Sequence, residues 1–139
     1  MGTNELTPQD LKDDVIVIRL TNRYEEKVRA NASGAPTAQE LYDITRSCWH
    51  ITKEKVKPFK VALSVHKGEV KEVYTVLDWY DAYTTFNENR VEPPENPRIE
   101  FIGDIADDAI RSRYRGKTLK GFFEPGAVNP IATFRKPSE

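Results

Sequence analysis

The stretch from residue 60 to residue 79 constrains the fold more than any other part of the chain. Its first half alternates large apolar side chains with small or polar ones, as a strand does; the apolar positions are Val61, Leu63 and Val65. The tetrad His66-Lys67-Gly68-Glu69 then predicts a turn, and a second β-rich run continues to Trp79. Val70 and Val73 are three residues apart, whereas a regular strand repeats every two, which indicates a β-bulge. We therefore expect an antiparallel hairpin here.

Further strands are indicated on both sides of this hairpin. Residues 15–20 are mostly β-branched and apolar, which is typical of a buried strand. Residues 98–103 alternate in polarity, and residues 131–134 form a short apolar run before the end of the chain. Both are expected to be strands.

Two helices carry recognisable termini. Thr37 and Glu40 have the spacing of a capping box, which predicts a helix that starts there and ends near Ser47. A second helix is expected over residues 106–114, with Asp104 as its cap and Gly116 as its stop. The polar stretch 21–36 is predicted to be a loop with a short helix around residues 24–29.

This order of elements predicts an α+β fold, a small curled sheet or partly open β-barrel flanked by two or three helices. A length of 139 residues suits one domain. We expect that domain to span residues 1–139, with flexible tails at 1–12 and 136–139.

The hairpin residues also resemble a known family. Ala62, the turn at 66–69, and the run Val70-x-x-Val73-Tyr74-x-Val76 that Trp79 closes are similar to the central hairpin of the PUA-like superfamily, with EVE, YTH and ASCH domains nearest. The resemblance implies a curled barrel plugged by helices. It also implies recognition of nucleic acid, often with a modified or flipped base held in an aromatic cage. ASCH-like members include nucleoside amidohydrolases with a Lys, a Thr and a Glu in the pocket, and Lys117-Thr118 resembles such a Lys-Thr pair.

Composition and charge exclude several kinds of protein and of binding site. Twenty-one Lys and Arg against 22 Asp and Glu leave a net charge of -1, which excludes nucleic-acid binding by bulk charge. Cys48 is the single cysteine, so an intrachain disulfide is impossible and a reducing, cytoplasmic location is expected. His50 and His66 lack metal-ligand spacing, and we expect no metal and no cofactor. No apolar run approaches the roughly 20 residues of a membrane span, so no membrane association is expected.

Aromatic residues near the end of the hairpin form the first candidate site. Trp49, Trp79, Tyr80 and Tyr83 could line a pocket in which a base stacks, with Arg46 near its edge. The alternative is that Trp49 and Trp79 belong to the core, as buried tryptophans usually do. Of the two, Trp49 is the better pocket candidate.

A basic run forms the second candidate site. Between residues 111 and 120 there are five cations and no acid, and the cations are Arg111, Arg113, Arg115, Lys117 and Lys120. Such a run could contact phosphates around the pocket. The alternative is a solvated helix face whose cations favour the helix C-terminus.

Together these features predict a module that recognises nucleic acid or a nucleotide through an aromatic pocket, with a plain or modified base, and with no catalytic residue assigned. One alternative is a small nucleobase or nucleoside hydrolase on the same fold. Another is a phage or mobile-element accessory protein that holds a protein partner with the loop at residues 81–97. The sequence leaves the oligomeric state open.

Overall fold

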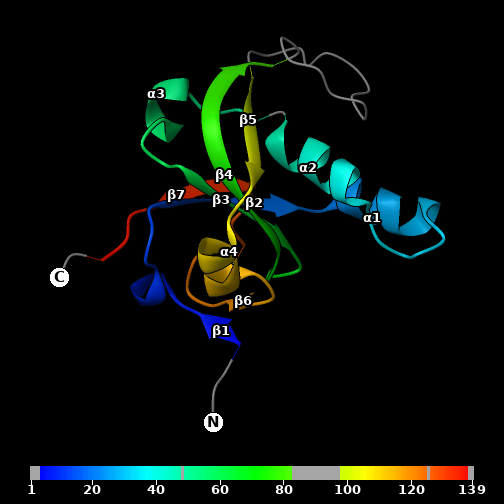
Figure 1. The fold of residues 1–139 in the computed structure, drawn as a ribbon, viewed down its shortest axis with the longest axis horizontal. Helices are drawn as coiled ribbons and strands as arrows, with labels where there is room; N and C mark the ends of the chain where they lie inside the picture. The colour runs from blue at the N-terminus through cyan, green and yellow to red at the C-terminus, as the bar shows by residue number, and fades with distance from the viewer. Residues whose placement is uncertain (1–3, 48, 83–97, 125, 138–139) are drawn as a thin grey trace.

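The computed structural model describes residues 4–47, 49–82, 98–124 and 126–137, which form one mixed sheet with helices on both faces (Figure 1). In these ranges the strands are β1 (Glu5–Leu6), β2 (Val15–Leu20), β3 (Val61–His66), β4 (Glu69–Asp81), β5 (Ile99–Ile105), β6 (Thr118–Leu119) and β7 (Ile131–Phe134). The helices are the 3-10 helix η1 (Pro8–Asp10) and the α-helices α1 (Asn22–Ala30), α2 (Ala38–Arg46), α3 (Lys53–Val56) and α4 (Asp108–Tyr114). No helix in these ranges is long and apolar enough to cross a membrane.

The sheet is mixed and remains open. Its strand order is β1-β6-β4-β3-β2-β7, and β5 pairs with β4 beside this path. β2 and β3 run parallel and in register, so that Leu20 lies opposite His66 at their carboxyl ends. The α+β class and the small curled sheet are confirmed. A closed barrel is not formed within the described residues, because β1 and β7 remain at opposite edges.

The hairpin is confirmed, including its bulge. Ser64 pairs with Glu72 while Val65 pairs with Val70, so the register shifts around Lys71. The turn residues Lys67 and Gly68 both have positive φ angles, 51° and 80°. A two-residue hairpin turn with left-handed backbone matches the twist of its strands, which is why a glycine is suited to the second position.

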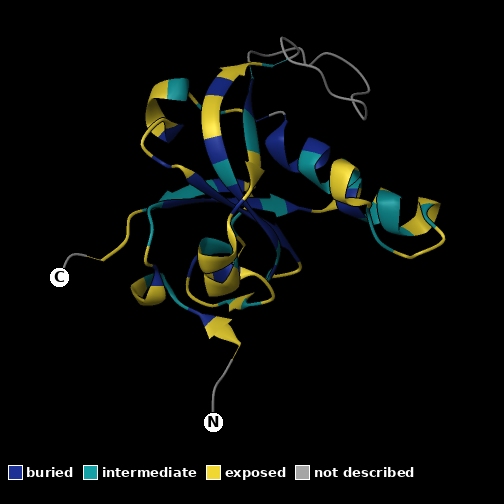
Figure 2. Cartoon of the chain, viewed as in Figure 1, coloured by how far each residue is buried: buried dark blue, intermediate teal, exposed yellow. Residues whose placement is uncertain are grey.

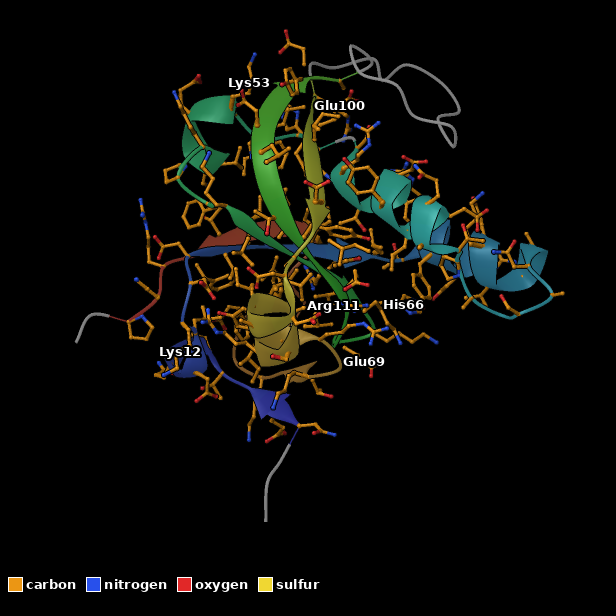
Figure 3. All side chains as sticks on the ribbon, in the orientation of Figure 1. Lys12, Lys53, His66, Glu69, Glu100 and Arg111 are labelled. Carbon is orange, nitrogen blue, oxygen red and sulfur yellow. The ribbon has the colours of Figure 1, made fainter. Side chains whose placement is uncertain are left out.

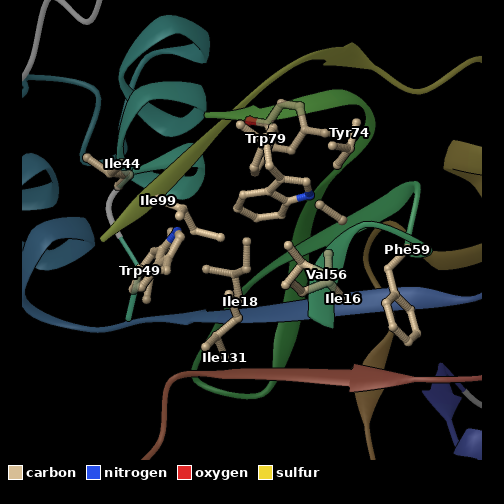
Figure 4. Packing of buried hydrophobic residues seen from close by; sticks show 14 of the residues in the cluster. Ile16, Ile18, Ile44, Trp49, Val56, Phe59, Tyr74, Trp79, Ile99 and Ile131 are labelled. Atoms are coloured by element: carbon tan, nitrogen blue, oxygen red, sulfur yellow. The ribbon is translucent and has the colours of Figure 1, made fainter. Parts of the chain in front are cut away.

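Two apolar cores lie on the two faces of the sheet, and β2 contributes to both. Ile16 and Ile18 point toward the core beneath α1, α2 and α3, which also contains Trp49, Trp79 and Phe101 (Figure 4). The alternate residues, Val15 and Val17, belong to the second core, beneath α4 and β1. Figure 2 shows the buried positions gathered on the crossing central strands. Burial on both faces explains why β2 is an almost continuous apolar run.

The capping box of α2 is confirmed. The Thr37 hydroxyl accepts a hydrogen bond from the Glu40 amide, and the Glu40 carboxylate accepts one from the Thr37 amide. The bond from the Thr37 amide, with those from Asn31 and Lys27, lowers the pKa of the Glu40 carboxyl to about 2.

The cap predicted for the last helix is wrong. Asp104 is still part of β5, where it pairs with Thr75, and Asp107 caps α4 by accepting a hydrogen bond from the Ile110 amide. β5 extends further than its pattern indicates because β4 continues beside it and satisfies its backbone groups.

Residues 4–12 are not a tail, contrary to the sequence expectation. β1 pairs in parallel with β6, and Leu6 and Leu11 are buried in the second core. A two-residue strand has almost no local signal, and only its distant partner makes it a strand. α3 was likewise not predicted, and the expected short helix near residues 24–29 is the longer α1.

Candidate nucleotide-binding pocket

The two tryptophans of the predicted aromatic pocket lie in the first core. Trp49 is 8% and Trp79 6% exposed. The Trp49 indole donates a hydrogen bond to the Thr45 carbonyl at 2.7 Å, and Trp79 packs edge-on against Phe101 with ring centroids 5.2 Å apart. Tyr80 is exposed on β4. Tyr83 lies outside the described residues.

Arg46 is buried in an ionic network rather than placed at a pocket edge. Its guanidinium lies 3.5 Å from the Asp43 carboxylate and 3.8 Å from that of Glu100, and it donates to the Phe101 carbonyl at 3.1 Å. The side chains of Arg46, Asp43 and Glu100 are each at most 1% exposed. The network therefore joins the end of α2 to β5.

Acidic partners neutralise most of the basic run. Arg111 makes two hydrogen bonds to Glu72, at 2.7 and 2.9 Å, and Arg115 approaches the same carboxylate at 3.7 Å. Arg113 pairs with Asp13 at 2.9 Å, and Lys120 lies 4.0 Å from Glu5. Among the described residues Lys117 has no such pair. The structure therefore leaves little of this run available for phosphate.

A hollow of about 420 Å³ lies where β2 and β3 end together. Figure 3 shows His66 and Glu69 at this end of the hairpin, far from Lys53 and Glu100 at the other end of the sheet. The end of β2 and the loop 127–130 supply the apolar side chains of the lining, which we call the apolar wall. Residues of α1 and the hairpin turn supply most of its polar side chains, which we call the polar wall. The lining residues are Arg19, Leu20, Thr21, Glu25, His66, Lys67, Gly68, Ala127, Val128 and Pro130.

A Glu–His pair forms the polar wall. The Glu25 carboxylate lies 3.2 Å from Nε2 of His66. The His66 ring stacks on Tyr24 with centroids 4.1 Å apart and planes at 19°. Glu25 and Tyr24 are consecutive residues of α1, so one helical turn holds the imidazole from its face and from its edge.

Arg19 fixes the apolar wall. Its backbone amide donates to the Pro130 carbonyl, and its guanidinium donates to the carbonyls of Ala127 and Asn129 at 3.1 and 2.6 Å. The guanidinium also lies 3.8 Å from the centre of the Phe123 ring. The loop that closes the pocket is therefore tied to the end of β2 by both the backbone and the side chain of Arg19.

The end of the basic run adjoins this pocket. The Leu119 amide donates to the Gly68 carbonyl at 2.7 Å, and the Val70 amide donates to the Lys117 carbonyl at 2.9 Å. Lys67 and Lys117 are fifty residues apart in the chain, yet the segments that carry them are joined by these backbone bonds. Lys67 is exposed, and no ion pair is formed by it within the described ranges.

Sequence reasoning missed most of this pocket. It placed His66 at a turn, but it could not pair that turn with Leu20, because the parallel pairing of β2 with β3 spans more than forty residues. Glu25 lay in a stretch read mainly as loop. The available signal was the coincidence of two apolar runs, 15–20 and 61–65, that both end in polar turn residues.

Comparisons of this chain with protein-family models, with curated proteins and with solved structures gave no match. The resemblance to the PUA-like superfamily therefore stays a prediction.

Proposed function

We propose that the pocket at the carboxyl ends of β2 and β3 binds a nucleotide unit, either free or within a nucleic-acid strand. The observation that carries this proposal is the pairing of an apolar wall with a polar wall in a hollow of about 420 Å³. That volume is within the range of small-molecule sites, near its lower end, and suits one nucleotide rather than several. A ring would pack against Leu20, Val128 and Pro130.

One cation in the pocket lining, and a second on the adjoining segment, support a phosphate-bearing ligand. Lys67 is exposed at the tip of the turn and Lys117 lies on the adjoining segment. A lysine ammonium provides a compact positive charge for phosphate. In addition, carboxyl ends of parallel strands are the usual place for ligands in open α/β sheets, and here the parallel pair β2 and β3 ends at the pocket.

Lys67→Ala should raise the Kd for a short single-stranded oligonucleotide or a nucleoside monophosphate about tenfold, because a charge-assisted contact to phosphate is worth roughly 1.5 kcal/mol. The measurement is a fluorescence or calorimetric titration across a salt series, with plain and methylated ligands. Lys57→Ala is the matched control, because Lys57 is exposed near α3 at the other end of the sheet. Binding that Lys67→Ala and Lys57→Ala weaken equally would contradict the proposal, as would no binding to the wild type.

A second candidate function is hydrolysis of an amide on a nucleobase or nucleoside. The observation that favours it is that Thr21, Glu25 and Lys67 line one pocket, which are the residue types that the resemblance to ASCH-like amidohydrolases implies. Lys117-Thr118 fits this role less well, because Thr118 is exposed in β6. In such a reaction Glu25 would take a proton from water, the oxygen would add to the amide carbon, and the C–N bond would break as the proton passes to the leaving nitrogen.

Incubation with an N-acylated cytidine separates the two functions. Release of the free nucleoside, detected by chromatography and abolished in Glu25→Gln, would establish the hydrolase. Saturable binding with no product would leave the pocket as a binding site alone. The protein-partner hypothesis depends mainly on residues 83–97, which lie outside the described residues.

A further inference from the structure

We propose that Glu25 selects the base in this pocket: the site takes a nucleotide whose base presents N–H donors on its Watson–Crick edge, guanine above all, and disfavours uracil. This inference rests on the proposed function of the pocket and adds to it the class of ligand.

The first step is the state of the Glu25 carboxylate. Glu25 lies in the first turn of α1 and lines the pocket, and its side chain is 39% exposed. Oε2 lies 3.2 Å from the His66 imidazole. The other oxygen has no hydrogen-bond partner among the described residues. An ionised carboxylate only accepts hydrogen bonds, so the polar wall offers acceptor capacity to whatever occupies the hollow.

The second step is that this carboxylate is held in place. His66 is nearly buried, with a side chain 9% exposed, and its ring is stacked on Tyr24 at 4.1 Å. Its backbone is also fixed, because it pairs with Leu20 of β2 and with Glu69 of β4. A binding group whose partner is locked by packing on regular strands discriminates better than one on a free side chain.

The third step is the chemistry of the bases. Guanine carries an N1–H and an N2–H side by side, two donors that match the two oxygens of a carboxylate. Cytosine and adenine each present an amino group beside an acceptor. Uracil presents one N–H between two carbonyl oxygens, which would face the carboxylate charge. Glu25, Lys67, Val128 and Pro130 all line the same hollow. If the ring packs against Val128 and Pro130 and the phosphate meets Lys67, the Watson–Crick edge is the part of the ligand left for Glu25.

The test is a set of titrations of the full chain with the monophosphates of guanosine, cytidine, adenosine and uridine. We expect the wild type to bind the guanosine ligand at least tenfold more tightly than the uridine ligand. Glu25→Gln should reduce that ratio to about threefold or less, since an amide offers a donor as well as an acceptor. Glu26→Gln is the matched control, because Glu26 is the next residue of α1, is exposed, and does not line the pocket.

The outcomes separate the two proposals. If all four ligands bind the wild type equally, or if Glu25→Gln keeps the preference, the role of Glu25 is overturned while the pocket's function stands. If none of the four binds, both are overturned. The measured quantity is the ratio of two Kd values on the same protein. If part of the Glu25→Gln protein is unfolded, both titrations are affected alike, so the ratio does not change for that reason.

Discussion

Arg46→Ala should lower the free energy of unfolding by about 3–5 kcal/mol, because it removes the positive charge from a buried network and leaves the two buried carboxylates without their shared counter-charge. Asp43 and Glu100 lie 3.5 and 3.8 Å from the guanidinium, and all three side chains are almost wholly inaccessible to solvent. The guanidinium also satisfies the Phe101 carbonyl. Urea unfolding followed by circular dichroism measures the change.

The matched control for this variant is Arg29→Ala. Arg29 is an exposed arginine in the last turn of α1, and its loss should change stability by less than about 0.5 kcal/mol. A loss below about 1 kcal/mol for Arg46→Ala would show that the network is not stabilised by this charge. Both variants remove an arginine side chain from a helix. Any difference between their losses of stability therefore comes from burial and not from the residue type.

Trp49→Ala should destabilise the protein by about 3–5 kcal/mol, the usual cost of truncating a buried tryptophan. Trp49 is 8% exposed, pairs with Ile99 across an isolated bridge, and donates its indole hydrogen bond to Thr45. Thermal and urea unfolding measure the loss. Trp49→Phe, which keeps most of the packing, should bind nucleotide as the wild type does, because Trp49 is not among the residues that line the pocket.

This prediction decides between two interpretations of the same residue. The sequence hypothesis makes Trp49 a pocket wall, whose loss should weaken ligand binding and leave the fold intact. The structure places it in the core. A Trp49→Ala variant that keeps its unfolding midpoint but loses nucleotide binding would therefore restore the aromatic pocket and contradict the structural assignment. Tyr80→Ala, at an exposed position of the same hairpin, serves as the control.

Local signals predicted the elements that local chemistry decides. The hairpin needs only its alternation, its Lys67-Gly68 turn and the irregular spacing of Val70 and Val73. The start of α2 needs only Thr37 and Glu40, two residues three positions apart that bond to each other across the first turn. In both cases the interacting residues are close in sequence, so a short stretch of sequence is enough to predict the interaction.

The candidate site was predicted poorly for the opposite reason. Trp49, Arg46 and the basic run were chosen by residue type, and the structure pairs or buries nearly all of them. A cation in a sequence shows its charge but not its partner: Glu72 and Asp13, which neutralise Arg111 and Arg113, are 39 and 100 residues away. Whether a charged residue is free for a ligand is therefore a property of the fold.

Local sequence patterns are enough to predict the α+β class, the hairpin and the capped helix, because hydrophobic periodicity and capping act over a few residues. Only the folded chain shows that β2 and β3 lie parallel, that β1 joins the sheet, and that Glu25, His66 and Lys67 line one hollow together with residues of the loop 127–130. These outcomes depend on backbone pairing between segments from more than forty to more than one hundred residues apart. That pairing is selected by burial on both faces of the sheet, a condition that no local pattern contains.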